Sequence, residues 1–302
     1  REYLVQPGLL YAGTETGMLV SMDDGASWQS LQLNLPTAQV PGVVLRDDDV
    51  IIATHGRSYW VLDNISPLRQ VAALQQGDLP GLGGSAAASA RAANAILFKP
   101  ADAVRTLSRP VESYRRTKRF APEFDYWLSE DVERVQLEVL DAEGNVIRSY
   151  ASDAEDRAER GGLSSSAGHH RIAWDMRYPG PRDFEGLIFW AANTQGPLAP
   201  PGDYQVRLTV EGDVQMQSFS IVKDPRLTDV TQADFDAQFE LASQIAARVD
   251  DAHRAIVQIR DVRAQVDDRL SDVDGGEVVE FAESFKGGIG EVEGEIYQVR
   301  LE

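Results

Sequence analysis

The chain has 302 residues and carries 29 lysines and arginines against 48 aspartates and glutamates, a formal net charge of −19. This balance excludes a protein that binds the nucleic-acid backbone, which needs a basic surface. The hydrophobic fraction of 43% excludes a disordered chain. The absence of cysteine excludes disulfides, zinc–thiolate sites and thiol catalysis. No run of about 18 apolar residues is available for a membrane span.

The negative charge is concentrated at one end of the chain. Residues 228–302 carry 7 basic and 18 acidic side chains, a net charge of −11. A GC-rich genome or a salt-adapted surface explains this composition more simply than an acidic binding function. The chain starts without methionine and ends inside a helical pattern, so we expect an internal fragment of a longer protein.

Residues 1–71 predict a first domain made of short β-strands. Strands are expected where apolar residues alternate between turn signals. The expected strands are residues 9–14, 18–22, 28–33, 43–46, 49–54 and 59–62. Such short, evenly spaced strands are typical of a sandwich, a barrel or a propeller.

One turn in this domain has a specific pattern, S-x-D-x-G-x-x-W, formed by Ser21, Asp23, Gly25 and Trp28. Asp23 is expected to accept backbone N–H bonds, and Gly25 to supply a positive φ. Trp28 is expected to pack under the loop, between neighbouring sheets. These are structural roles, so Asp23 is not expected to be a catalytic acid.

The pattern is that of the Asp-box, or BNR repeat. The segments LYAGTETGMLVSMDDGASWQSLQLNLP and VIIATHGRSYWVLDNISPLRQ resemble the final blades of bacterial sortilin/Vps10-like BNR propellers, over residues 5–72. Members of that group are commonly catalogued as glycosyl hydrolases. The resemblance implies the last one and a half to two blades of a β-propeller, with the preceding blades absent, and an extracytoplasmic (periplasmic or secreted) location.

Four residues of this domain are candidates for ligand binding. His55 and Arg57 flank a glycine and could meet an anionic or carbohydrate ligand, with Glu15 and Asp63 nearby. The alternative, which we favour, is structural: Arg57 pairs with a carboxylate of a neighbouring blade and His55 closes a turn. Tyr59, Trp60 and Leu62, on the last strand of the domain, are expected to belong to the core.

Residues 72–94, rich in Ala, Gly and Ser, are expected to form a linker or long surface loop. Residues 95–226 then predict a second β domain. Its expected strands are residues 95–98, 124–128, 134–140, 146–150, 170–176, 204–210 and 216–222. About seven strands without cysteine fit an immunoglobulin-like sandwich. The stretch HHRIAWDMRYPGP…GPLAPPGDYQVRLTV resembles immunoglobulin-like modules of the flagellar-hook-cap type, which implies a structural or adhesive spacer.

Two features of the second domain suggest ligands, but simpler explanations exist. The basic cluster 115–119 could attract an anion, although an exposed loop paired with acidic neighbours is the simpler interpretation. His169 and His170 are adjacent, so on a strand they point to opposite faces, and we expect no metal site there.

Residues 227–302 predict an acidic, amphipathic helical hairpin that is truncated at its end. Thr231 with Asp234 forms a short capping box, and Gly275-Gly276 separates two helices. Apolar residues at three- and four-residue steps define a seam on each helix. The expected seam of the second helix comprises Val278, Phe281, Phe285, Ile289, Val292, Ile296 and Val299.

The fold class we predict is therefore mainly β plus α, and two functions remain open. The favoured one is a fragment that binds peptide or glycan ligands, with a spacer sandwich and a helical segment for self-association or for docking to missing parts of the chain, and that is not catalytic on its own. The alternative is a sialidase- or xyloglucanase-like glycoside hydrolase whose catalytic carboxylates lie mostly in the missing blades, because no catalytic pair can be named here. No cofactor and no metal are expected, and no phosphate-binding loop, nucleophile elbow or HExxH motif is present.

Overall fold

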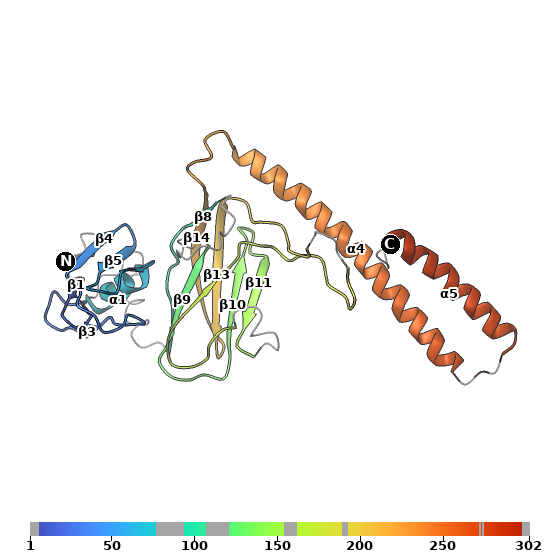
Figure 1. The fold of residues 1–302 in the computed structure, drawn as a ribbon, viewed down its shortest axis with the longest axis horizontal. Coiled ribbons are helices and arrows are strands. Elements are labelled where there is room, and N and C mark those ends of the chain that lie inside the picture. Colours follow the sequence, from blue (N-terminus) through green and yellow to red (C-terminus); the bar gives the residue numbers. More distant parts are fainter. Residues whose placement is uncertain are drawn as a thin grey trace. The chain divides into compact units, whose positions relative to one another are not determined.

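The computed structural model describes residues 6–76, 94–106, 121–153, 162–188, 193–271, 273 and 275–297. It mixes β-strands with helices and ends in a helix pair (Figure 1). The chain divides into two compact units. The first unit comprises Arg1–Asp175 with Pro201–Arg226, and the second Met176–Pro200 with Leu227–Glu302. The segment 176–200, which we assigned to the second β domain, thus groups with the helices. The predicted basic cluster 115–119 lies outside the described residues.

The first unit begins with two three-stranded antiparallel sheets. The first sheet contains β1 (Leu10–Gly13), β2 (Met18–Ser21) and β3 (Gln29–Ser30). The second contains β4 (Gly42–Arg46), β5 (Asp49–Ala53) and β6 (Tyr59–Leu62). In each sheet the strands follow chain order, because tight turns join sequential antiparallel strands.

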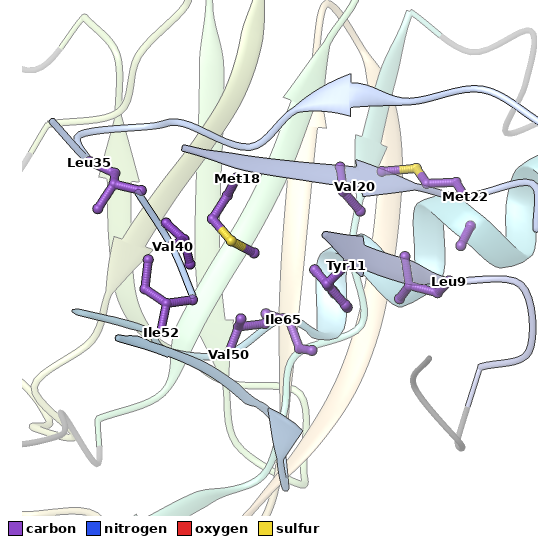
Figure 2. Close-up of a cluster of buried hydrophobic side chains, with 11 residues drawn as sticks. Leu9, Tyr11, Met18, Val20, Met22, Leu35, Val40, Val50, Ile52 and Ile65 are labelled. Carbon is purple, nitrogen blue, oxygen red and sulfur yellow. The ribbon is translucent and has the colours of Figure 1, made fainter. Parts of the chain in front are cut away.

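The two sheets share one apolar core, shown in Figure 2. Alternate residues of β1, β2, β4, β5 and β6 point into it, as the two-residue period of a strand requires, whereas both residues of β3 are exposed. The buried cluster comprises Leu9, Tyr11, Met18, Val20, Met22, Leu35, Val40, Val50, Ile52, Ile65 and Ala72. Tyr59, which we expected in this core, is 78% exposed because it lies on the outer face of β6.

A helix, α1 (Ser66–Gln76), follows the second sheet and was not predicted. Residues 72–76 were expected to begin the linker 72–94, but they form the end of this helix, and Ala72, Ala73 and Leu74 are buried. The side-chain oxygen of Asn64 accepts hydrogen bonds from the backbone N–H and the hydroxyl of Ser66. Proline is favoured in the first turn of a helix, so Pro67 next to this cap was a signal for helix initiation.

Two further sheets complete the first unit. Their strands are β7 (Ala95–Leu97), β8 (Ala103–Arg105), β9 (Glu123–Leu128), β10 (Val135–Leu140), β11 (Val146–Ala151), β12 (Gly168–Ala173), β13 (Gly202–Val210) and β14 (Asp213–Lys223). The orders are β11-β10-β13-β14-β8 and β12-β9-β7. All seven predicted strands are present. The three-residue strand β8 was missed, because it pairs in parallel with β14, a long-range contact that leaves no local pattern.

Aromatic side chains join these two sheets. Phe124 of β9 packs edge-on against Phe219 of β14, with ring centroids 5.2 Å apart. Trp174, which follows β12, is fully buried and packs against Tyr204 and Phe219 at 5.8 and 6.5 Å. Edge-to-face pairs at these separations are favourable, so the core lies between the five-stranded and the three-stranded sheet.

The second unit contains the predicted helix pair, α4 (Gln232–Leu270) and α5 (Glu277–Ile296), which lie side by side in Figure 1. The capping box of Thr231 and Asp234 is confirmed, since each side chain bonds the other residue's backbone N–H. Gly275 and Gly276 separate the helices with φ of 73° and 98°, a conformation that favours glycine.

The face of α5 that meets α4 shares only Ile289 with the predicted seam, whose last member, Val299, lies outside the described residues. The less exposed positions of α5 are Val279, Ala282, Lys286, Ile289, Gly290 and Glu293. Polar contacts hold this face: Lys286 pairs with Asp267 at 2.6 Å, and Glu293 with Arg260 at 2.8 Å. The predicted seam was wrong at its other described positions, because polar contacts join the helices there. Five of its large apolar residues lie instead on a neighbouring, exposed stripe, namely Val278, Phe281, Phe285, Val292 and Ile296.

Residues 176–188 pack along α4. Tyr178 packs against Phe239 in a tilted arrangement with a centroid distance of 4.6 Å, and Phe184 packs edge-on against His253 at 5.1 Å. The buried His253 places Nδ1 2.6 Å from the carbonyl oxygen of Arg182. Aromatic and polar contacts thus anchor this segment to the helix.

Candidate functional site

The turn at residues 21–28 is built around Asp23. Its Oδ1 accepts hydrogen bonds from the Ser27 backbone N–H and from the Ser21 hydroxyl, both at 2.8 Å. Gly25 has a φ of 88° and donates its N–H to the Ser21 hydroxyl. Asp23 is therefore engaged in holding the turn. Trp28 is 42% exposed, which contradicts its expected packing between sheets, because the shared core is filled by other side chains.

These bonds make the turn sensitive to pH. Hydrogen bonds from the side chain and backbone of Ser27, and then from Ser21, hold the pKa of Asp23 below its ordinary 3.8. A carboxylate whose pKa is lowered by folding stabilises the fold above its unfolded pKa, and this stabilisation disappears as the pH falls through the folded pKa. We expect Asp23→Asn to lower Tm by a few degrees at pH 6 and by progressively less below pH 3.8.

Thermal unfolding between pH 6 and pH 2 tests this expectation. Asp24→Asn is the matched control, because it removes the same charge from the same turn without a described bond to Ser27. A Tm difference between Asp23→Asn and the native chain that stays constant across this pH range would contradict the assignment.

The four predicted ligand-binding residues do not form one site. Glu15, His55 and Arg57 lie in two exposed turns on either side of residues 39–40. Val40 N–H bonds the Thr14 carbonyl, and His55 N–H bonds the Gln39 carbonyl, each at 2.9 Å. Asp63 lies beyond the opposite end of β6, where its carbonyl oxygen accepts a bond from Arg171 at 3.3 Å.

Asn64, the residue after Asp63, lines a cavity of about 630 Å³ within the first unit. Its walls are mostly apolar. They come from residues between 31 and 75, which include α1, and from residues between 96 and 171, which belong to the later sheets. The lining residues are Leu31, Leu33, Leu62, Asn64, Ile65, Pro67, Leu68, Val71, Leu74, Gln75, Ile96, Phe98, Trp127, His169 and Arg171. This volume and this composition are those of a small-molecule or side-chain pocket.

Polar contacts fix the helix that forms one wall. The Gln70 amide on α1 donates to the Lys99 carbonyl at 2.9 Å and accepts from the Lys99 N–H at 2.8 Å. At the end of α1, Gln76 donates to the carbonyl of Met22 at 2.9 Å. Since both pairs join segments distant in sequence, α1 is held at its middle and at its C-terminal end.

Arg171 is the centre of the polar edge of the cavity. Its Nε donates to Asp125 at 2.8 Å, and Nη1 lies 3.2 Å from Glu123. Nη2 donates to the Asn64 carbonyl at 3.1 Å. This bond ties β12, an edge strand of the sheet β12-β9-β7, to the start of α1. Burial by itself would lower the pKa of Arg171, but the hydrogen bond and charge of Asp125, with Glu123, outweigh it and raise that pKa.

Asp125 also holds the histidine of this edge. His169 Nε2 lies 2.8 Å from Asp125 Oδ1, and the Asp125 side chain is only 4% exposed. A buried carboxylate that binds one imidazole nitrogen fixes the ring and its tautomer. His169 is half-exposed, so its other nitrogen is available to a ligand.

The cavity offers apolar walls and one polar edge. The described cavity lining contains no serine, threonine or lysine that could serve as a nucleophile beside His169. Glycoside hydrolysis needs two carboxylates on either side of the scissile bond, and both Asp125 and Glu123 are engaged by Arg171. Among the described residues, no group of three or more His, Asp or Glu side chains could hold a metal ion.

The sequence contained a signal for this edge that the prediction did not use. His169 and Arg171 alternate on one face of β12, and His170 points to the other face, where it packs against Tyr126. Arg171 lies directly opposite Asp125, and His169 opposite Trp127. Opposite charges placed across two strands favour pairing, but only the register reveals which residues lie opposite.

The comparisons with known proteins add little to this description. No family model matches the chain, and no curated protein matches it at the significance required. Among solved structures, the chain is similar to CopC from Methylosinus trichosporium OB3b, with 12% identity over 44% of this chain and 98% of that protein. The TM-score of 0.22 is too low for this similarity to support an argument. Within the described residues, no helix combines the length and the apolar character needed to span a membrane.

Proposed function

We propose that this chain is a non-catalytic binding module that takes an apolar side chain of a peptide into the cavity beneath α1. The observation that carries the proposal is the cavity itself, about 630 Å³ with apolar walls and one fixed polar edge. Apolar walls favour a hydrophobic side chain over a sugar ring, whose hydroxyls need several partners. At the edge, His169 is placed to bond a peptide group.

The family assignment belongs to the same proposal. The two meanders and the Asp23-centred turn support final blades of a sortilin/Vps10-like BNR propeller. The two facing sheets that follow support an immunoglobulin-like spacer. A periplasmic or secreted location follows from the same resemblance. The glycoside hydrolase alternative has no specific observation in its favour, because the carboxylates at the cavity edge are engaged in ion pairs.

Calorimetric titration with N-acetyl-Leu-Phe-Leu-amide tests the binding site. Val71 lines the cavity, so Val71→Phe should fill part of it and weaken binding by about tenfold or more. Val44→Phe is the matched control, because Val44 is 55% exposed on another face. Trp127 also lines the cavity, so its fluorescence should change on titration and this change should be lost in Trp127→Phe.

Three results would overturn the proposal. One is peptide binding that survives Val71→Phe unchanged. Another is binding of a xyloglucan oligosaccharide, but not of the peptide, that Val71→Phe abolishes. The third is turnover of aryl-glycosides by this chain, which would replace the binding module with an enzyme.

A further inference from the structure

Helix α5 exposes a continuous apolar stripe, which we call the α5 stripe. Its members follow one another at steps of three, four, seven and four residues, so they lie on one side of the helix. The α5 stripe comprises Val278, Phe281, Phe285, Val292 and Ile296, with exposures of 67%, 75%, 43%, 47% and 42%. Large apolar side chains gathered in this way mark an interaction surface.

The α5 stripe takes no part in the polar contacts that hold the helix pair. The contacts with α4 come from the neighbouring face, through Lys286 with Asp267 and Glu293 with Arg260 and Arg263. The stripe could therefore receive another helix without opening the pair. Gly288 lies on the stripe between Phe285 and Val292, and nothing stands within 4 Å of the place where its Cβ would be, so a second helix has room to approach closely.

A groove on α4 continues this apolar surface. The groove has a volume of about 770 Å³, and Ile296 of the α5 stripe forms part of its lining, together with Leu241, Ile245 and Ala252 of α4. Leu241 and Ile245 are 60% and 56% exposed. The stripe and the groove thus meet at Ile296.

The charges beside the α5 stripe indicate what it binds. Exposed carboxylates of α5 stand on the solvent side of the stripe, namely Glu277, Glu280, Glu291 and Glu295. The one basic residue in α5, Lys286, is bonded to Asp267 and Glu283 on the face toward α4. A second copy of this chain would bring carboxylates against carboxylates, whereas a helix with lysines or arginines beside its apolar residues would be attracted.

We propose that the α5 stripe and the adjoining groove on α4 bind an amphipathic helix of another polypeptide, whose apolar side is flanked by basic residues. This helix packs its apolar side chains on Phe281 and Phe285 and pairs its basic residues with Glu277 and Glu280. The site is separate from the cavity in the first unit.

Fluorescence anisotropy with the whole chain tests this proposal. The probes are two labelled 21-residue helical peptides with leucine at heptad positions a and d, one with lysine and one with glutamate at e and g. We expect the lysine peptide to bind, with a loss of about tenfold in affinity on Phe281→Ser and a further weakening in high salt. Tyr59→Ser is the matched control, since Tyr59 is an aromatic residue of similar exposure, 78% against 75%.

Each remaining outcome would overturn the proposal. Equal binding of the two peptides would reduce the stripe to a non-specific apolar surface. Lysine-peptide binding that Phe281→Ser leaves unchanged would place the attraction elsewhere on the acidic chain. Sedimentation of the native chain as a dimer that Phe281→Ser dissociates would show that a second copy covers the stripe.

Discussion

Replacement of Trp174 by alanine should destabilise the first unit by about 3–5 kcal/mol, the range for removing a large aromatic side chain from a core. Trp174 is fully buried and contacts Tyr204 and Phe219, so its loss leaves a cavity between the two sheets. For a unit of this size we expect a fall in Tm of about 10 °C, measured by differential scanning calorimetry. The second unit should unfold at its native temperature if the units unfold independently.

Trp28→Ala is the control for this experiment. Trp28 is 42% exposed and lies outside the shared core, so its removal should lower stability by about 1 kcal/mol or less. Equal effects of the two variants would mean that Trp174 is not the centre of the core between the two sheets. A smaller loss of stability in Trp174→Phe than in Trp174→Ala would show that the lost side-chain volume, rather than the lost indole N–H, causes the destabilisation.

Replacement of Arg260 by alanine should loosen the second unit by about 2–4 kcal/mol. Arg260 donates to Glu293 at 2.8 Å and to the Glu185 carbonyl at 3.1 Å. Its guanidinium also lies over the rings of Phe184 and Tyr297, at 4.9 and 5.8 Å. Removal of Arg260 leaves the Glu293 carboxylate, whose side chain is 5% exposed, with the more distant Arg263 as its described ion-pair partner. The penalty for an under-paired buried charge is large, although partial exposure of Arg260 reduces it.

Amide hydrogen exchange measures this effect where it arises. In Arg260→Ala, the amides of α5 and of the segment 176–188 should exchange faster, while the strands of the first unit remain unchanged. Arg263→Ala is the matched control on α4, because Arg263 is 3.4 Å from Glu293 and packs on neither ring in the described contacts. Its effect should be about 1 kcal/mol or less. Equal effects of the two substitutions would mean that the ring contacts contribute nothing.

The candidate site was much less predictable than the fold. His55 and Arg57 were chosen because polar side chains beside a glycine often bind ligands, and Glu15 because it was expected nearby. The turn of His55 and Arg57 precedes β6, however, whereas Asn64, which lines the cavity, follows it. The polar edge of the cavity joins Arg171 to Asp125, 46 positions away. The face of α5 was likewise mispredicted, because apolar spacing shows where a stripe lies and not whether another helix covers it.

The sequence by itself determined the local elements of this protein. Two-residue alternation located the strands, Thr231 with Asp234 marked the start of α4, and Gly275-Gly276 separated the two helices. These signals are local, because they depend on the conformational preferences of neighbouring residues. Only the tertiary structure decided which sheets share a core, which residues surround the cavity and which side of α5 stays exposed. Each of these depends on contacts between residues distant in the chain, and such contacts form only when whole sheets and helices pack together.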